Sequence, residues 1–206
     1  MMAGIIGKKI GMTRVFDETG VQVPVTVVEA GPCPVAQIKT KDRDGYEAIQ
    51  LGFGVKKAHR SPKAEVGHVS AAGLEAAPRI VREVQVDADV AYELGQALTV
   101  EQFEVGDRVK VSGTSKGRGF QGVVKRHGFT GRPGGHGHPM SRNPGSIGPG
   151  TNPSRVIKGK RLPGQMGGAR TTVRNMQVVK IDGERNLLFI KGGIPGSRDS
   201  YVLITK

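Results

Sequence analysis

The sequence has little of what several protein classes require. Its 206 residues include one cysteine, Cys33, which excludes a disulfide scaffold and a cysteine-rich zinc site. Tryptophan is absent, and aromatic residues make up only 4% of the chain. No apolar run approaches the roughly 20 residues of a membrane-spanning helix. Lys8 and Lys9 interrupt the first apolar stretch, so no secretory signal is expected. We therefore expect a soluble protein of a reducing compartment.

The most informative absence is that of carboxylates from one long internal segment. The chain carries 31 Lys and Arg against 18 Asp and Glu, and residues 108–181 hold 15 of these cations and no acid. Residues 1–107 hold 12 cations and 15 acids, and residues 182–206 hold 4 and 3. A solvated charged face normally mixes both signs, so this pattern favours a polyanionic partner. Nucleic acid is the favoured partner, and an acidic membrane or protein surface is the alternative.

Short strand-like segments separated by turns dominate the remainder of the chain. Alternating or β-branched stretches bounded by Gly, Pro, Asn and Asp indicate strands. The predicted strands are 5–16, 21–28, 35–40, 46–53, 79–86, 97–103, 108–111, 173–181, 186–191 and 201–205. The polar stretch 56–73 is expected to contain loop and a short helix. Many short strands with turns between them favour a small β-barrel or sandwich.

Residues 130–170 show neither a helix period nor a strand period. These 41 residues contain 11 Gly, 6 Pro and only 7 apolar residues. Such a segment buries too little apolar surface to order itself. We expect an extension that becomes ordered on RNA, and a mobile surface loop is the alternative. Folded back as a hairpin, about 20 residues in each leg reach roughly 60 Å.

Three short motifs resemble enzyme or metal sites, but each lacks the partners that its chemistry needs. Gly117–Gly122 matches G-x-G-x-x-G, but the acidic residue that a dinucleotide site needs about 20 positions on is absent. Gly113–Gly117 matches G-x-S-x-G, but no histidine follows Asp182 to complete a triad. His136 and His138 have no carboxylate or thiol nearby, which favours contact with RNA or solvent over metal binding. We expect no catalytic residue, no metal and no cofactor.

The same segment suits RNA that is recognised through its backbone. Lys116 and Arg118 lie between glycines, where backbone N–H groups can bind phosphate oxygens. Residues 123–127 are expected to form a short helix with a basic face, and 158–161 form a second basic cluster. Only two phenylalanines lie in the basic segment, so folded RNA is favoured over single strands.

Ordered motifs along essentially the whole chain resemble one family. They are Gly4–Arg14, Pro24–Val27, Gly31–Pro34, Asp44–Tyr46, Gly113–Gly122, Pro144–Gly148, Lys158–Arg161, Asn186–Leu188 and Lys191–Gly192. In this order they resemble bacterial large-subunit ribosomal protein L-three, and Gly113–Gly122 matches the most specific motif of that family. Many bacterial members carry glutamine, sometimes methylated, where this chain has Pro149, so this methylation is not expected here.

The resemblance implies a fold and a function. The fold is a mainly β, translation-protein-type β-barrel with a small α+β insertion and a long non-globular basic extension. Residues 1–111 and 171–206 form the barrel domain, with the inserted region at about 55–95, and 112–170 form an extended Gly/Pro-rich loop that penetrates RNA. The implied function is structural, in the large ribosomal subunit. By this resemblance the protein is expected to bind large-subunit ribosomal RNA, to support early subunit assembly and to reach toward the peptidyl transferase centre. Ribosomal proteins L-fourteen and L-nineteen are implied neighbours. The resemblance also implies a cytoplasmic location, and neither a membrane partner nor a homo-oligomer is expected.

Site residues follow from the basic segment and from the resemblance together. The expected phosphate contacts are Lys116, Arg118, Lys125, Arg126, Arg132, Arg142, Arg155, Lys158, Lys160, Arg161 and Arg170. Lys8, Lys9 and Arg14 are further candidates. The loop tip expected near the peptidyl transferase centre consists of Pro144, Gly145, Ser146, Ile147, Gly148, Pro149 and Gly150.

Two other functions compete with this hypothesis. A free-standing nucleic-acid chaperone or DNA-binding protein would bind unrelated duplexes about as well as ribosomal RNA. An enzyme that uses the Gly-rich loop for a phosphorylated cofactor would need a carboxylate pair or a metal site.

Overall fold

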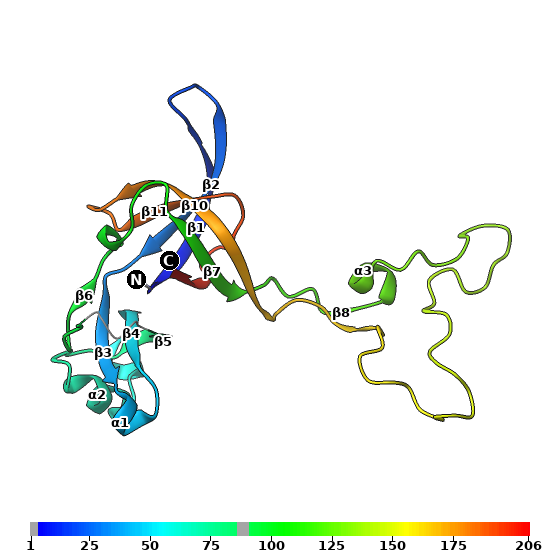
Figure 1. The fold of residues 1–206 in the computed structure, drawn as a ribbon, viewed down its shortest axis with the longest axis horizontal. Coiled ribbons are helices and arrows are strands. Elements are labelled where there is room, and N and C mark those ends of the chain that lie inside the picture. The colour runs from blue at the N-terminus through cyan, green and yellow to red at the C-terminus, as the bar shows by residue number, and fades with distance from the viewer. Residues whose placement is uncertain (1–3, 86–90) are drawn as a thin grey trace. The chain divides into compact units, whose positions relative to one another are not determined.

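The structure, a computed structural model, describes residues 4–85 and 91–206 (Figure 1). The described part of the chain is mainly β-structure, as the sequence predicts. It divides into two compact units, one made of the residues up to Thr114 together with Arg170–Lys206, the other of Ser115–Ala169. Within the described ranges, no helix is long and apolar enough to cross a membrane.

A closed antiparallel barrel forms the centre of the first unit. Its strands are, in order around the barrel, β1 (Gly4–Phe16), β12 (Tyr201–Thr205), β7 (Arg108–Thr114), β10 (Arg170–Asp182), β11 (Leu187–Lys191) and β2 (Gln22–Ala30). Ile5 on β1 lies opposite Ile204 on β12, and Ile204 lies opposite Val111 on β7. The barrel therefore depends on strands from both sides of the basic extension.

Alternation along the barrel strands separates an apolar interior from a polar exterior. Ile5, Val28, Val111 and Ile204 are fully buried inside. Burying each such side chain stabilises the fold by about 1.5–3 kcal/mol. Gly7 lets β1 and β2 approach closely, because a Cβ atom there would lie 2.5 Å from Cγ1 of Val28.

A four-stranded antiparallel sheet lies between β2 and β7 in sequence, in the order β5-β4-β3-β6. Its strands are β3 (Cys33–Lys39), β4 (Ala48–Val55), β5 (Pro78–Gln85) and β6 (Ala97–Leu98). The helical turns are α1 (Lys41–Asp44), η1 (Ala58–Arg60), α2 (Lys63–Ser70) and η2 (Val100–Gln102). Val35 and Leu51 of this sheet share one hydrophobic cluster with Ile5 and Ile204 of the barrel. The sheet therefore packs on the barrel within one unit.

The inserted sheet begins earlier in the chain than the predicted insertion at about 55–95. Val35 pairs with Leu51 in this sheet and not with a barrel strand. Strand composition reports that a segment is extended, but it does not report which sheet the segment joins, because pairing is non-local. The first two strands after β2 therefore belong to the insertion.

The strand predicted for 97–103 is wrong beyond its first two residues. Only Ala97 and Leu98 pair, with Pro34 and Cys33, and η2 follows. The 3₁₀ turn buries Val100 and Phe103, so the apolar residues that suggested a strand fill the core from a turn. Val86, the last residue of the strand predicted for 79–86, lies outside the described residues.

Cys33 is a packing residue of the core. Its side chain is buried, and Sγ donates a hydrogen bond to the carbonyl oxygen of Ile6 at 3.3 Å. Burial raises the pKa of the thiol to about 12. The thiolate is therefore scarce at neutral pH, so Cys33 is a poor nucleophile.

Candidate nucleic-acid interface

The two legs of the basic extension pair with each other where they leave the barrel. The Ser115 N–H donates to the carbonyl of Ala169 at 2.9 Å, and the Gly168 N–H donates back to Ser115 at 3.1 Å. Further out, the Arg118 N–H donates to Met166 at 2.9 Å. The legs then form two short strands, β8 (Phe120–Gln121) and β9 (Gly164–Gln165). We call this paired region, 115–129 with 162–169, the neck.

Glycine is required where the legs cross closely. Gly167 has φ of +71°, and a Cβ atom there would overlap the carbonyl oxygen of Lys116. A side chain at this position would therefore meet both backbone strain and a clash with fixed backbone. The glycines of this segment, which the sequence analysis interpreted as suited to RNA contact, thus also have a structural role in the neck.

A short helix, α3 (Val123–His127), closes the neck. Val123 is buried, and the helix ends at Gly128 with φ of +72°, a residue type suited to that conformation. Arg126 Nη1 donates to the carbonyl oxygen of Leu162 at 2.7 Å. His127 Nε2 lies 3.0 Å from the same oxygen, which only accepts, so Nε2 carries the proton in this arrangement. Sequence patterns missed the role of Leu162, because a backbone carbonyl leaves no signal in the side-chain sequence.

Beyond the neck, residues 130–161 contain no helix or strand. Its apolar side chains stay in solvent: Met140 is 54% exposed, Ile147 47% and Ile157 53%. The tip, Pro144–Gly150, is exposed except for the half-buried Pro144. This stretch has no core of its own.

Charge in the second unit has one sign. Residues 115–169 hold ten Lys and Arg and no acidic residue. Nine of these cations are exposed, and Arg126 is half-buried by its contact with Leu162. Because no carboxylate in the unit can neutralise them, their mutual repulsion favours a polyanionic partner.

The structure separates the remaining candidate cations. Arg170 lies in the first unit, at the start of β10 opposite Thr114. Lys9 is buried, and its ammonium donates to the carbonyls of Ile194 and Gly196 at 3.0 and 3.2 Å. Lys8 forms an ion pair with Asp199 at 2.7 Å, and this partner raises the pKa of Lys8. Both ammonium groups therefore already have partners within the first unit.

We next consider metal binding among the residues that the structure describes. No group of three or more His, Cys, Asp or Glu residues there is placed to hold an ion. Near the loop tip, His138 Nδ1 accepts a hydrogen bond from the N–H of Met140 at 3.2 Å.

These features define a class: a β-barrel protein with a basic, carboxylate-free extension suited to a polyanion. Comparisons with known proteins narrow the class. The family model described as "Ribosomal protein L3" matches residues 63–189. Large ribosomal subunit protein uL3 of Herpetosiphon aurantiacus is 51% identical over 207 residues, which cover 100% of this chain and 97% of that protein. The protein of the same name from Pelotomaculum thermopropionicum is 51% identical, covering 99% of this chain and 96% of the relative.

The chain therefore belongs to the ribosomal protein L3 family, as the resemblance indicated. It is a ribosomal protein of the large subunit and not an enzyme. The G-x-G-x-x-G and G-x-S-x-G matches accordingly lie in structural elements of the neck and of β7.

Proposed function

We propose that this protein binds large-subunit ribosomal RNA through the extension at 112–170, which runs into the RNA while the barrel domain of 1–111 and 171–206 stays outside. The observation that carries the proposal is the unit of ten cations and no carboxylate, which has no core beyond its neck. Phosphate neutralisation supplies both the affinity and the order that the loop lacks by itself.

The contacts that we propose are the basic side chains named from the sequence. They are Lys116, Arg118, Lys125, Arg126, Arg132, Arg142, Arg155, Lys158, Lys160, Arg161 and Arg170. Of these, Arg126 uses one Nη for the carbonyl of Leu162, which leaves its other N–H groups for phosphate. The others of the second unit extend into solvent without an ion pair among the described residues.

Salt dependence of binding tests these contacts. Each phosphate contact contributes about 0.7–0.9 to the slope of log affinity against log salt concentration. Replacing Lys158, Lys160 and Arg161 with alanine should lower the slope for ribosomal RNA by about two units. The matched control replaces Lys57, Arg60 and Lys63 with alanine. These substitutions remove the same total charge from exposed positions in the inserted region. Equal slopes for the two triple variants would contradict the assignment.

We further propose that the tip, 144–150, approaches the peptidyl transferase centre. A Ser146→Cys variant carrying a tethered iron chelate should cleave RNA of that centre in assembled subunits. Cys33 stays unlabelled because burial raises the pKa of its thiol to about 12. A Thr19→Cys variant places the same probe on an exposed turn of the barrel domain and should cleave elsewhere. Cleavage by the Ser146 probe only at distant sites would refute this part of the proposal.

The remaining parts of the proposal concern assembly and neighbours. We propose that the protein joins the subunit early and lies beside ribosomal proteins L-fourteen and L-nineteen. Reconstitution without it should stop before late proteins bind, and delayed addition should not restore particles as fully as early addition. Lysine cross-linking of whole subunits should join exposed lysines of the barrel domain to those two proteins. Cross-links exclusively to other proteins would remove them as neighbours.

A further inference from the structure

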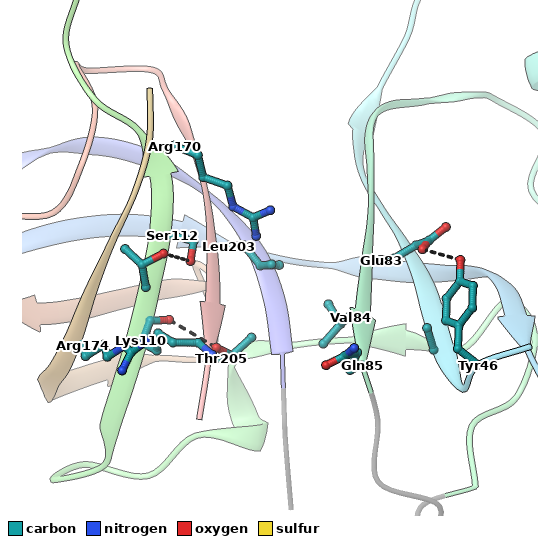
Figure 2. A pocket seen from close by; sticks show the side chains of 12 residues that line it. Tyr46, Glu83, Val84, Gln85, Lys110, Ser112, Arg170, Arg174, Leu203 and Thr205 are labelled. Atoms are coloured by element: carbon teal, nitrogen blue, oxygen red, sulfur yellow. Dashed lines mark hydrogen bonds between the residues drawn. The ribbon is translucent and has the colours of Figure 1, made fainter. Parts of the chain in front are cut away.

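A basic groove lies on the outside of the first unit, between the barrel and the inserted sheet (Figure 2). Strands β7, β10 and β12 form one wall, and β4 and β5 form the other. The hollow has a volume of about 440 Å³, and an adjoining hollow of about 330 Å³ shares Ser112, Arg170 and Leu203 with it. We call the two together the barrel groove.

Four cations line the barrel groove: Arg82, Lys110, Arg170 and Arg174. Lys110 lies on the barrel exterior because its neighbours Val109 and Val111 point into the core. Figure 2 shows the Arg170 side chain extending from its strand into the space between the two walls. All four side chains are exposed, and among the described residues none of them forms an ion pair.

Among the residues that the structure describes, the only carboxylate that lines the groove is that of Glu83, and it is already neutralised. Lys39 Nζ lies 2.8 Å from it, and the Tyr46 hydroxyl donates to it at 2.9 Å. These two partners lower the pKa of Glu83, so the carboxylate stays ionised and bound to its own cation. It therefore offers little compensation to the four groove cations, and the described lining of the groove keeps a positive excess.

The groove floor adds neutral donors. Ser112 Oγ and Thr172 Oγ1 lie 2.8 Å apart on the paired strands β7 and β10. Only one of the two hydroxyl protons is used between them, so the other remains for an acceptor in the groove. Hydroxyl donors beside Arg and Lys are the usual set that contacts phosphate oxygens of nucleic acids.

We propose that the barrel groove binds phosphates of an RNA backbone, as a second anchoring site whose cations, except Arg170, lie outside the extension. Arg170 and Arg174 are separated by about 13 Å at about 3.3 Å per strand residue, so the cations suit several successive phosphates and not a single anion. This inference rests on the proposed RNA-binding function and assigns to it three cations that lie outside the extension, Arg82, Lys110 and Arg174.

The test uses the full-length protein and ribosomal RNA. A double variant, Lys110→Ala with Arg174→Ala, is compared with a control double variant, Arg60→Ala with Lys63→Ala, which removes the same two charge types at exposed positions away from the groove. The groove variant should lower the salt slope by one to two units, and the control should leave it within half a unit. Inorganic phosphate at millimolar concentration should not compete with ribosomal RNA for binding to the protein, whereas a short RNA duplex should compete.

A second measurement does not depend on variant stability. A photo-crosslinking amino acid at Thr205, which lines the groove, should join the protein to RNA in assembled subunits. A crosslink to an acidic protein segment instead would overturn the inference, as would equal slopes for the groove and control variants. If the groove variant matches the control while the extension triple variant still lowers the slope, the groove proposal fails alone. If neither lowers the slope, the proposed RNA-binding function fails with it.

Discussion

Arg126 Nη1 donates a hydrogen bond of 2.7 Å to the carbonyl oxygen of Leu162, 36 residues further along the chain. This contact joins α3 on the outgoing leg of the extension to the start of the returning leg. It gives a residue expected to contact phosphate a second role, which is to hold the base of the extension together.

Replacing Arg126 with alanine should loosen the neck. Loss of a charge-assisted, part-buried hydrogen bond costs about 1–2 kcal/mol, which corresponds to a five- to thirty-fold change in an opening equilibrium. The amide of Arg118, which bonds to Met166, should exchange with solvent faster by that factor. Lys125→Ala is the control, because Lys125 is exposed on the same helix. Equal exchange in both variants would show that the Leu162 contact does not hold the neck.

Gly167→Ala should disrupt the neck more than Gly168→Ala. Both residues have positive φ, +71° and +69°, so each alanine incurs the left-handed backbone penalty of about 1–2 kcal/mol. Only at Gly167 does the added methyl group also overlap the Lys116 carbonyl, since no atom lies within 4 Å of a Cβ at Gly168. Trypsin should therefore cleave after Lys116 and Arg118 faster in the Gly167 variant. Identical cleavage rates would argue against the close crossing of the two legs.

Lys9→Met should destabilise the barrel. The buried ammonium satisfies the carbonyls of Ile194 and Gly196, and methionine leaves both without that charged donor. We expect a loss of about 2–3 kcal/mol in the free energy of unfolding. Urea denaturation measures it, and Lys8→Met is the control. Lys8 pairs with Asp199 on the surface, so its loss should be clearly smaller. A larger loss at Lys8 would reverse this assignment.

A low pH should weaken the ion pair between Asp107 and Lys206. Lys206 Nζ lies 2.7 Å from the carboxylate, and the Glu104 N–H donates to the same side chain at 2.9 Å. Both contacts lower the pKa of Asp107 below its ordinary 3.8, Lys206 more strongly. A folded-state pKa below the unfolded one gives stability that is complete above the ordinary value and is lost as pH falls through the lowered value.

Asp107→Asn tests this pH dependence. The variant should melt at a lower temperature than the parent protein at pH 7, and the difference should shrink as pH falls from about 4 toward 2. Thermal unfolding across this range measures the effect. A difference that stays constant down to pH 2 would mean that the carboxylate charge does not stabilise the fold.

Local features of the sequence were sufficient for most of the strands, though not for 97–103, and for the distribution of charge. The predicted ranges 5–16, 173–181 and 201–205 fall within β1, β10 and β12, because alternating apolar residues reflect burial on one face of a strand. The short helix at 123–127 also agrees with α3. The absence of acidic residues from 108–181 is a property of composition and needed no coordinates.

Tertiary structure decided what depends on distant pairing. Whether Cys33–Lys39 joins the barrel or the inserted sheet follows from its partner Ala48–Val55, and both strands look alike in sequence. The neck forms because Leu162 presents a backbone carbonyl to Arg126, and a carbonyl has no side-chain signature.

The sequence by itself thus determined that this is a β-rich protein with one long basic segment free of carboxylates, because residue types set charge and local period. Only the tertiary structure placed Arg82 in one groove with Lys110 and Arg174, on three different strands. The physical reason is that hydrophobic burial and strand pairing bring distant segments together without regard to their surface charges. Which charged side chains become neighbours on the outer face is therefore a result of that packing.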